Sequence, residues 1–268
     1  MPTPPPYALV VTDLDGTLLG SGDTVSARSQ AALARVAARG ARHVVATGRP
    51  VPEVRPVLAD LGYRGLAVCG QGAQVYDTVT GTMLFSLTLD RALARTAVAK
   101  IEAETGPVFL AVNQCTADGR TFAEHGYRVA HPLLPVTRVA GRTGLWVEPV
   151  AKVLLCHPDL GDDELAAAAR AVVGELVTVT MAGPGVVELQ PLGVTKATGL
   201  AVVAERLGLR GADAIAFGDM PNDITMFGWA AHGVAMANAH PALRAVADET
   251  TLSNDEDGVA VILEALYR

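Results

Sequence analysis

The sequence has few cysteines and no excess of basic residues, and each absence excludes a class of protein. Its three cysteines, Cys69, Cys115 and Cys156, are odd in number and form no C-x-x-C pair. They therefore predict neither a disulfide framework nor a zinc site, and we interpret them as buried free thiols in a reducing cytoplasm. The formal net charge of −7 argues against a nucleic-acid or acidic-membrane partner, which would favour a basic face.

The hydrophobic stretches of the chain are short. None approaches the roughly 20 residues that span a bilayer, and the first residues lack the basic start and apolar region of a signal peptide. We therefore expect a cytoplasmic protein without membrane contact. At 268 residues, with 50% of them hydrophobic, the chain is long enough for one large domain or two smaller ones.

Apolar runs alternate with amphipathic helical segments over much of the chain, a pattern typical of a parallel sheet with helices on both faces. The runs end in small or polar residues. We expect strands in 7–13, 41–49, 65–77, 214–219 and 233–238, with their carboxyl ends at Thr12–Asp13, Thr47–Gly48, Gly70–Gln71, Gly218–Asp219 and Ala237–Asn238. Ligands bind at the carboxyl ends of the strands in open α/β sheets. These strand ends are therefore expected to converge on one site.

The pattern changes between about Met83 and Glu188. Alternating apolar residues there predict antiparallel strands, and two helical segments are expected at 90–104 and 162–175. We interpret 83–188 as an inserted α+β domain, with 1–82 and 189–268 forming the main domain. Two chain connections would join the parts and permit a hinge-like closure over the site.

Two pairs of aspartates follow expected strands. Asp13 and Asp15 lie in VVTDLDGTLL, and Asp219 and Asp223 lie in FGDMPND. One pair alone could equally cap a helix or fill a turn. Two pairs at neighbouring strand ends would repel each other without a cation, and they suit Mg²⁺, which binds carboxylates, water and substrate phosphate.

Four motifs occur in order over most of the chain: DLDGTLL, ATGRP, GVTKATGL and GDMPNDITMF. Together they resemble the motifs of the haloacid dehalogenase superfamily, specifically its Cof-type phosphatases. The resemblance implies a Rossmann-like parallel-sheet core with an α+β cap of type C2B inserted after the third core strand. This agrees with the insertion inferred from the change in pattern.

The resemblance also implies roles for the matched residues. Asp13 would be the nucleophile that forms an aspartyl-phosphate, and Asp15 would be the general acid and base. The phosphate and the substrate would be bound by Thr47, the Gly48 amide, Lys196 and Asn222. Mg²⁺ would be bound by Asp13, the Asp15 carbonyl, Asp219 and Asp223, the last either directly or as support for another ligand.

Several residues leave alternatives open. Thr17 would orient either Asp13 or its loop, and Arg49 would bind phosphate or form an ion pair that supports the loop. Gln71 stands where the family usually has Asn, and Ala237 stands where Gly is frequent, so substrate fit is the property these departures affect. Other conspicuous residues are expected to be solvent-exposed, namely Arg120, His125, Arg128, His131, Glu148 and Lys152, or to lie in the cap core, namely Phe109 and Trp146.

These observations predict a Mg²⁺-dependent phosphatase, monomeric or homodimeric, that hydrolyses small phosphomonoesters through Asp13. Sugar phosphates, nucleotides and cofactor-precursor phosphates all fit a small site closed by a cap. A phosphomutase would use the same aspartyl-phosphate but return the group to bound substrate. A non-catalytic metabolite-binding regulator on the same fold is a third alternative.

Overall fold

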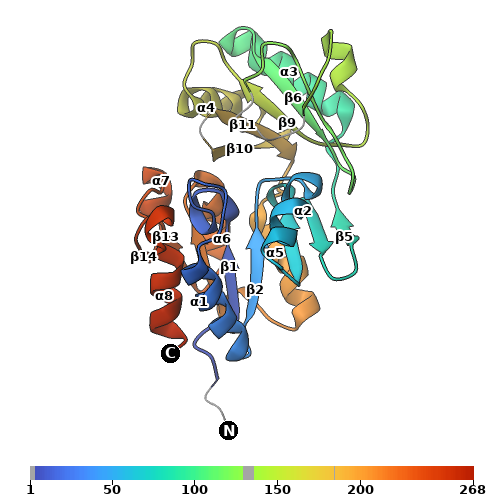
Figure 1. Cartoon of the computed structure of the whole chain (residues 1–268). Coiled ribbons are helices and arrows are strands. Elements are labelled where there is room, and N and C mark those ends of the chain that lie inside the picture. The colour runs from blue at the N-terminus through green and yellow to red at the C-terminus, as the bar shows by residue number, and fades with distance from the viewer. Residues whose placement is uncertain (1–3, 129–135, 184) are drawn as a thin grey trace.

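The computed structural model describes residues 4–128, 136–183 and 185–268. They form an eight-stranded sheet and a six-stranded sheet, each covered by helices, and the smaller sheet lies over one end of the larger (Figure 1). This arrangement agrees with the expected α/β core and inserted α+β cap.

The larger sheet has the strand order β14-β13-β12-β1-β2-β3-β4-β5. Its strands are parallel up to β3, whereas β4 and β5 are antiparallel. The strands are β1 (Leu9–Thr12), β2 (Arg42–Ala46), β3 (Leu66–Cys69), β4 (Gln74–Asp77), β5 (Thr82–Ser86), β12 (Ala214–Gly218), β13 (His232–Ala235) and β14 (Glu249–Thr250).

The stretch 65–77 contains two strands rather than one, because the chain reverses at Gly70–Gln71, where the end of a strand was expected. Gln71 has a φ of 58°, and the turn Gly70–Gly72 sends the chain back from β3 into β4. Left-handed backbone at a residue other than glycine is uncommon, so hydrophobicity alone gave no sign of this turn. Its consequence is that the Gln71 side chain lies at the carboxyl end of β3.

Helices cover both faces of the larger sheet. One face packs against α1 (Ala27–Ala38), α2 (Val51–Asp60) and α8 (Gly258–Leu266), and the other against α5 (Lys196–Leu207) and α6 (Ile224–Trp229). The sides alternate along β1: Val10 belongs to the first cluster, while Leu9 and Val11 belong to the second. With both faces buried, only the strand ends are left for polar groups.

The smaller sheet has the order β10-β11-β9-β6-β7-β8 and is antiparallel except for the pair β7 and β8. Two helices, α3 (Arg91–Thr105) and α4 (Asp162–Val173), pack on one face. The strands are β6 (Phe109–Gln114), β7 (Thr121–Ala123), β8 (Val136–Arg138), β9 (Val150–Cys156), β10 (Val177–Gly183) and β11 (Val186–Pro191). We call this unit the cap and the rest the core.

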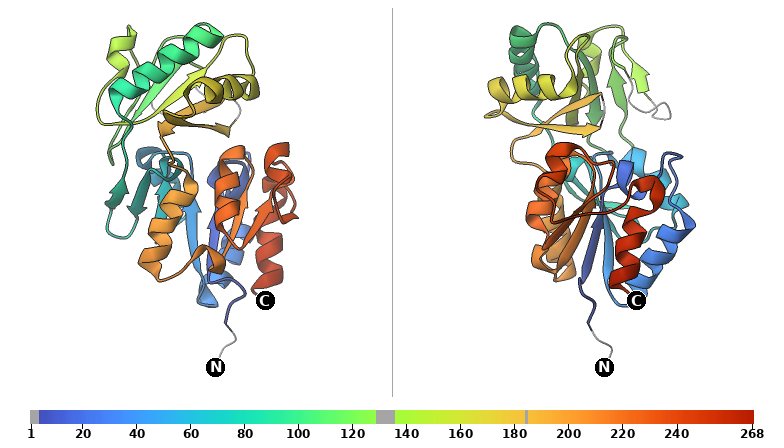
Figure 2. Two further views of the ribbon diagram at one scale, coloured as in Figure 1. Left: turned by 180° about the vertical axis from the view of Figure 1, so that it is seen from behind. Right: turned by 90° about the vertical axis from the view of Figure 1, so that its left-hand side faces the viewer.

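The second face of the cap sheet turns toward the carboxyl ends of the core strands (Figure 2). Strand β5 still belongs to the core sheet and β11 to the cap sheet, so the junctions lie a few residues after the expected limits at 83 and 188. The three cysteines are buried and free, as predicted. Among the described residues, no helix has the length and apolar character needed to cross a bilayer.

Candidate active site

The acidic residues of the first motif follow the central core strand. From β1 the chain continues to β2 on one side, and β12 pairs with β1 on the other, so the strand order reverses here. Asp13 directly follows β1, and its amide donates to the Phe217 carbonyl at 3.0 Å. Asp219 directly follows β12. Neighbouring parallel strands therefore bring together two carboxylates that are 206 residues apart in the sequence (219 − 13).

The turn after Asp13 passes very close to Asp219. Gly16 has a φ of 70°, and a Cβ atom at this position would lie 2.3 Å from Asp219 Oδ2. Glycine is therefore needed here for both its backbone conformation and the space. The Thr17 hydroxyl donates to Asp219 Oδ1 at 3.0 Å, so Thr17 positions the second aspartate, a contact that the sequence had not indicated.

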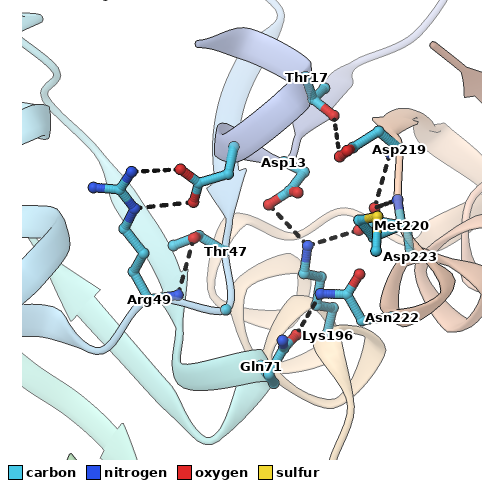
Figure 3. Close-up of polar contacts among 12 residues, drawn as sticks. Asp13, Thr17, Thr47, Arg49, Gln71, Lys196, Asp219, Met220, Asn222 and Asp223 are labelled. Carbon is cyan, nitrogen blue, oxygen red and sulfur yellow. Dashed lines mark hydrogen bonds and ion pairs between the residues drawn. The ribbon is translucent and has the colours of Figure 1, made fainter. Parts of the chain in front are cut away.

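Lys196 is the cation at the centre of the cluster. It starts α5 and is fully buried, and its Nζ lies 2.8 Å from Asp13 Oδ1 and 2.6 Å from Asp223 Oδ1 (Figure 3). Burial opposes the charged form of the lysine, but the carboxylates of Asp13 and Asp223 outweigh it and raise the Lys196 pKa. Lys196 therefore remains an ammonium next to the nucleophile expected from the first motif.

Both oxygens of Asp223 are already engaged. Oδ1 pairs with Lys196, and Oδ2 accepts hydrogen bonds from the amides of Asp219 at 3.0 Å and Met220 at 3.1 Å. Potential ligand atoms of Asp13, Asp219 and Asp223 lie within 4.8 Å of one another. These three carboxylates form the acidic cluster discussed below.

Burial is the largest effect on the acids of this cluster. It raises the pKa of Asp13, against the lowering effect of Lys196, and the carboxylates of Asp223 and Asp15 raise it further. Burial likewise raises the pKa of Asp219, together with the nearby charges of Asp13 and Asp223. Additional negative charge is thus disfavoured in this buried site, and a bound cation would offset it.

Asp15 lies outside the buried cluster, with 44% of its side chain exposed. The Arg49 guanidinium binds the Asp15 carboxylate through two nitrogens: Nε donates to Oδ2 at 2.9 Å, and a terminal nitrogen contacts Oδ1. Of the two alternatives for Arg49, the structure has the ion pair. The Arg49 amide also donates to the Thr47 hydroxyl at 3.1 Å within the loop after β2, and the Arg49–Asp15 pair links this loop to the loop after β1.

The loop after β2 meets the cap. Thr47 is fully buried, and the carbonyl of Gly48 accepts a hydrogen bond from Lys152 Nζ of β9 at 2.8 Å. The same ammonium pairs with Glu188 of β11. The prediction of a solvated Lys152 is wrong, because its side chain is only 5% exposed. Lys152 lies on the face of the cap sheet that the core covers.

An amide chain continues from Glu188 into the core. Gln71 Nε2 donates to Glu188 Oε2 at 2.9 Å. Asn222 Nδ2 donates to Gln71 Oε1 at 2.9 Å, as Figure 3 shows. The departure from the family pattern at Gln71 therefore has a structural explanation: the longer amide reaches the cap on one side and Asn222 on the other. Ala237, the second departure, is exposed.

The structure also shows the exposure of the other residues that the sequence singled out. Arg120, His125, Arg128 and Glu148 are exposed as predicted, and Trp146 packs against the cap core. His131 lies outside the described residues. Phe109, expected in the core, is 38% exposed because it begins β6 at the surface, where its ring lies against Gly126.

Sequence reasoning missed three polar residues around the site: Lys152 as a buried group, Glu188, and Asn238. The first two had a signal, since Lys152 is the one charged residue of β9 and Glu188 is the one charged residue of β11. Asn238 Nδ2 donates to the Gly16 carbonyl at 2.8 Å and supports the turn after Asp13. An exposed asparagine in a loop offers no comparable pattern.

Comparison with known proteins identifies close fold and sequence relationships. A model of the haloacid dehalogenase-like hydrolases matches residues 10–263. The chain is 28% identical to the 5-amino-6-(5-phospho-D-ribitylamino)uracil phosphatase YwtE of Bacillus subtilis, over 96% of this chain and 97% of the relative. It is 29% identical to the HMP-PP phosphatase of Serratia proteamaculans, over 90% and 87% respectively.

Two further matches concern length and fold. The chloroplastic endoribonuclease YBEY of Arabidopsis thaliana is 28% identical over 98% of this chain, but this chain spans about half of that relative, 47%. The solved structure of SMU.1108c from Streptococcus mutans UA159 superimposes with a TM-score of 0.84 at 24% identity, covering 97% of this chain and 98% of the other. This likeness confirms the fold.

Proposed function

Because this chain belongs to the haloacid dehalogenase-like hydrolases and is a phosphatase of that family, we propose that it hydrolyses small phosphomonoesters through an aspartyl-phosphate on Asp13, with Mg²⁺ bound. The observation that carries this proposal is the position of Lys196. Its ammonium lies between Asp13 and Asp223 at the carboxyl ends of the central strands, where it can neutralise an incoming phosphate.

Asp13 is the proposed nucleophile. Its carboxylate oxygen attacks phosphorus, a bond forms from this oxygen to phosphorus, and the bond from phosphorus to the leaving oxygen breaks. Asp15 gives its proton to the leaving oxygen, and then removes a proton from the water that attacks the phosphoenzyme. Hydrolysis releases inorganic phosphate and restores the Asp13 carboxylate.

The Arg49 pair gives Asp15 a resting position. The pair has to open before the Asp15 carboxyl can take up a proton and face the leaving group, and its partial exposure leaves room for that movement. The guanidinium so released can bind a phosphate oxygen, because bidentate Arg contacts suit phosphate as well as carboxylate. Both alternatives for Arg49 then apply at different stages of the reaction.

The acidic cluster fits a divalent cation. Its three carboxylates and the Lys196 ammonium leave two negative charges in a buried site. Asp13, Asp219 and the Asp15 carbonyl are the proposed ligands, while Asp223, with both oxygens engaged, holds Lys196 and the loop after β12. When bound, Mg²⁺ would neutralise charge on the phosphoryl oxygens.

The phosphate would be held by Thr47, the Gly48 amide and Lys196, with Asn222 nearby. The Lys152 bond to the Gly48 carbonyl keeps this loop in place from the cap side. Sugar phosphates, nucleotides and cofactor-precursor phosphates remain the proposed substrates, and phosphatases of two cofactor-related compounds occur among the relatives. The proposed protein is cytoplasmic and acts as a monomer or homodimer.

A phosphate-release assay tests the proposed function. The purified protein is incubated with p-nitrophenyl phosphate, acetyl phosphate and a panel of phosphomonoesters, with Mg²⁺ or with a chelator. We expect inorganic phosphate to be released only with Mg²⁺. Transfer of the phosphoryl group to a second bound substrate without release would favour a phosphomutase, and binding without turnover would favour a regulator.

A further inference from the structure

A cavity of about 120 Å³ lies between the cap and the core beside Lys196. Its walls come from strands β10 and β11 of the cap, and from the start of α5 and the turn Pro221–Asp223 of the core. Because Lys196 both lines this cavity and pairs with Asp13, the cavity is one side chain away from the proposed nucleophile. We call it the acceptor cavity, because oxygens that can accept hydrogen bonds line it.

Three buried side-chain oxygens in its walls have no hydrogen-bond partner among the described residues. They are Thr180 Oγ1, Gln190 Oε1 and Asn222 Oδ1. Buried polar atoms in folded proteins nearly always have a partner, and leaving one unsatisfied is costly. Three such atoms around one cavity indicate that a ligand, or water in its absence, completes them.

The Lys152–Glu188 pair determines which atoms of the core amides face the cavity. A carboxylate held by an ammonium can only accept hydrogen bonds, so Gln71 must turn its NH₂ group toward Glu188. Gln71 Oε1 then has to accept, and Asn222 turns its own NH₂ group toward it. The carbonyl oxygen of Asn222 is left for the cavity.

The cap contributes a second oxygen by the same rule. Gln190 Nε2 lies 3.5 Å from Glu188 Oε2 and donates to it, which leaves Gln190 Oε1 free. The Glu188 carboxylate thus orients two amides: Gln190 directly and Asn222 through Gln71. The side-chain oxygens of both amides face the acceptor cavity as hydrogen-bond acceptors. The Thr180 hydroxyl is the third group, and it can accept or donate.

We propose that the acceptor cavity binds the leaving group of the substrate and selects esters whose leaving group donates hydrogen bonds, such as polyols and amino alcohols. A leaving group that carries a carboxylate brings further acceptors to amide oxygens that need donors, and is rejected. This inference rests on the proposed phosphatase function and names the substrate class within it.

Two cations in the walls favour the opposite selection. The Lys196 ammonium is already paired with Asp13 and Asp223, which leaves Arg170. Arg170 of α4 is exposed, and its Nε donates to the Val179 carbonyl at 3.2 Å. A carboxylate-bearing leaving group would be attracted to this guanidinium. The two amide oxygens are buried and fixed in orientation, whereas the Arg170 charge is screened by water, so we expect the amides to decide.

Matched pairs of substrates test the selection. Glycerol 3-phosphate and 3-phosphoglycerate differ by CH₂OH against a carboxylate, and so do sorbitol 6-phosphate and 6-phosphogluconate. We expect kcat/KM to favour the hydroxyl member by at least about 10-fold in one pair or both. p-Nitrophenyl phosphate, whose leaving group has no donor, reports the chemistry alone.

Two conservative variants locate the selection in the cavity. Thr180→Val and Gln190→Met should each lower kcat/KM for the preferred hydroxyl substrate by roughly 3- to 10-fold, the loss expected for one hydrogen bond. The melting temperature of each variant should stay near that of the wild type, which shows that the variants fold. Thr137→Val, an exposed position on β8, is the matched control and should change neither substrate.

The outcomes separate this inference from the proposed function. Release of phosphate from p-nitrophenyl phosphate without a preference within either pair, or with the carboxylate preferred, overturns the selection but leaves the phosphatase. Unchanged preference in Thr180→Val and Gln190→Met also overturns it. No turnover of any ester would instead overturn the proposed function.

Discussion

The two sheets of this protein carry their polar groups in different places. In the parallel core sheet both faces are apolar, and the acidic cluster lies at the strand ends. In the cap sheet the face beneath α3 and α4 is apolar, whereas the other face carries a small apolar cluster together with the polar side chains of Lys152, Glu188 and Gln190. Both sets are buried.

The difference lies in what buries them. The core aspartates are buried by their own domain, through the turn at Gly16 and the loop after β12. The cap residues are buried because the core covers their face, with Gly48 and Gln71 as contacts. The chemistry of the core therefore depends on local turns, whereas the orientation of the cap amides depends on how the two domains meet.

Removing the proposed nucleophile gives the largest expected effect and concerns the core alone. Asp13→Asn should reduce turnover by at least about 10⁴-fold, because the amide cannot form the aspartyl-phosphate. Trapping of the phosphoenzyme with labelled substrate checks this. Asp15→Asn should still form some phosphoenzyme with an activated leaving group such as p-nitrophenolate.

Asp60→Asn at the exposed end of α2 is the matched control and should leave turnover unchanged. Equal residual turnover in wild type and Asp13→Asn would contradict the assigned nucleophile.

Breaking the cap pair should give a large effect on stability. Lys152→Met leaves the buried Glu188 carboxylate without its cation and should lower the free energy of unfolding by about 3–5 kcal/mol. The double variant Lys152→Met/Glu188→Gln should recover much of that loss. Urea unfolding, followed for the cap and the core separately, measures both.

The pair Arg28–Glu264 provides the comparison at the surface, with side chains 46% and 29% exposed. Arg28→Met should cost much less than Lys152→Met, because water screens the exposed pair. If Lys152→Met cost no more than Arg28→Met, the cap pair would not be held by burial against the core.

Weakening the turn after Asp13 should have a smaller effect, on Mg²⁺ binding at the proposed metal site. Thr17→Val removes the hydrogen bond to Asp219 Oδ1 with little change in volume, and should weaken Mg²⁺ binding about 10-fold, as lost support of a ligand does. Titration of activity with Mg²⁺ checks it. Thr82→Val on the exposed edge strand β5 should have no effect.

The smallest expected effect is on the pH dependence of stability. Burial, then neighbouring carboxylates, raises the pKa of Asp219 above its ordinary 3.8, and burial also raises that of Asp13. Without metal, these carboxyl groups stay protonated to higher pH in the folded state than in the unfolded chain. The free energy of unfolding therefore falls as pH rises from about 4 through the raised pKa values. Mg²⁺ binding replaces the protons and offsets this loss.

Thermal unfolding should therefore show a larger stabilisation by Mg²⁺ at about pH 8 than at about pH 5.5, by about 1 kcal/mol or about 2–4 °C. The Asp219→Asn variant should lose most of this difference. A stabilisation that is equal at both pH values would argue against proton release from the acidic cluster.

The sequence by itself determined the parts of the protein that depend on neighbours in the chain. Alternation of apolar residues predicted a parallel sheet with an inserted antiparallel unit, and the motifs around Asp13, Lys196 and Asp219 identified the family. Carboxyl ends of parallel strands meet at one edge of a sheet. The approach of Asp13 to Asp219 therefore followed from the strand pattern, whereas Lys196, at the start of α5, was identified by its motif.

Only the tertiary structure decided the surroundings of polar residues within strands. A period of two assigns Lys152 and Glu188 to one face of the cap sheet, but the chain pattern is the same whether water or another domain covers that face. The left-handed turn at Gln71 and the Arg49–Asp15 pair also depend on contacts between distant segments. Because the core buries the Lys152–Glu188 pair, this pair can orient the amides of the acceptor cavity.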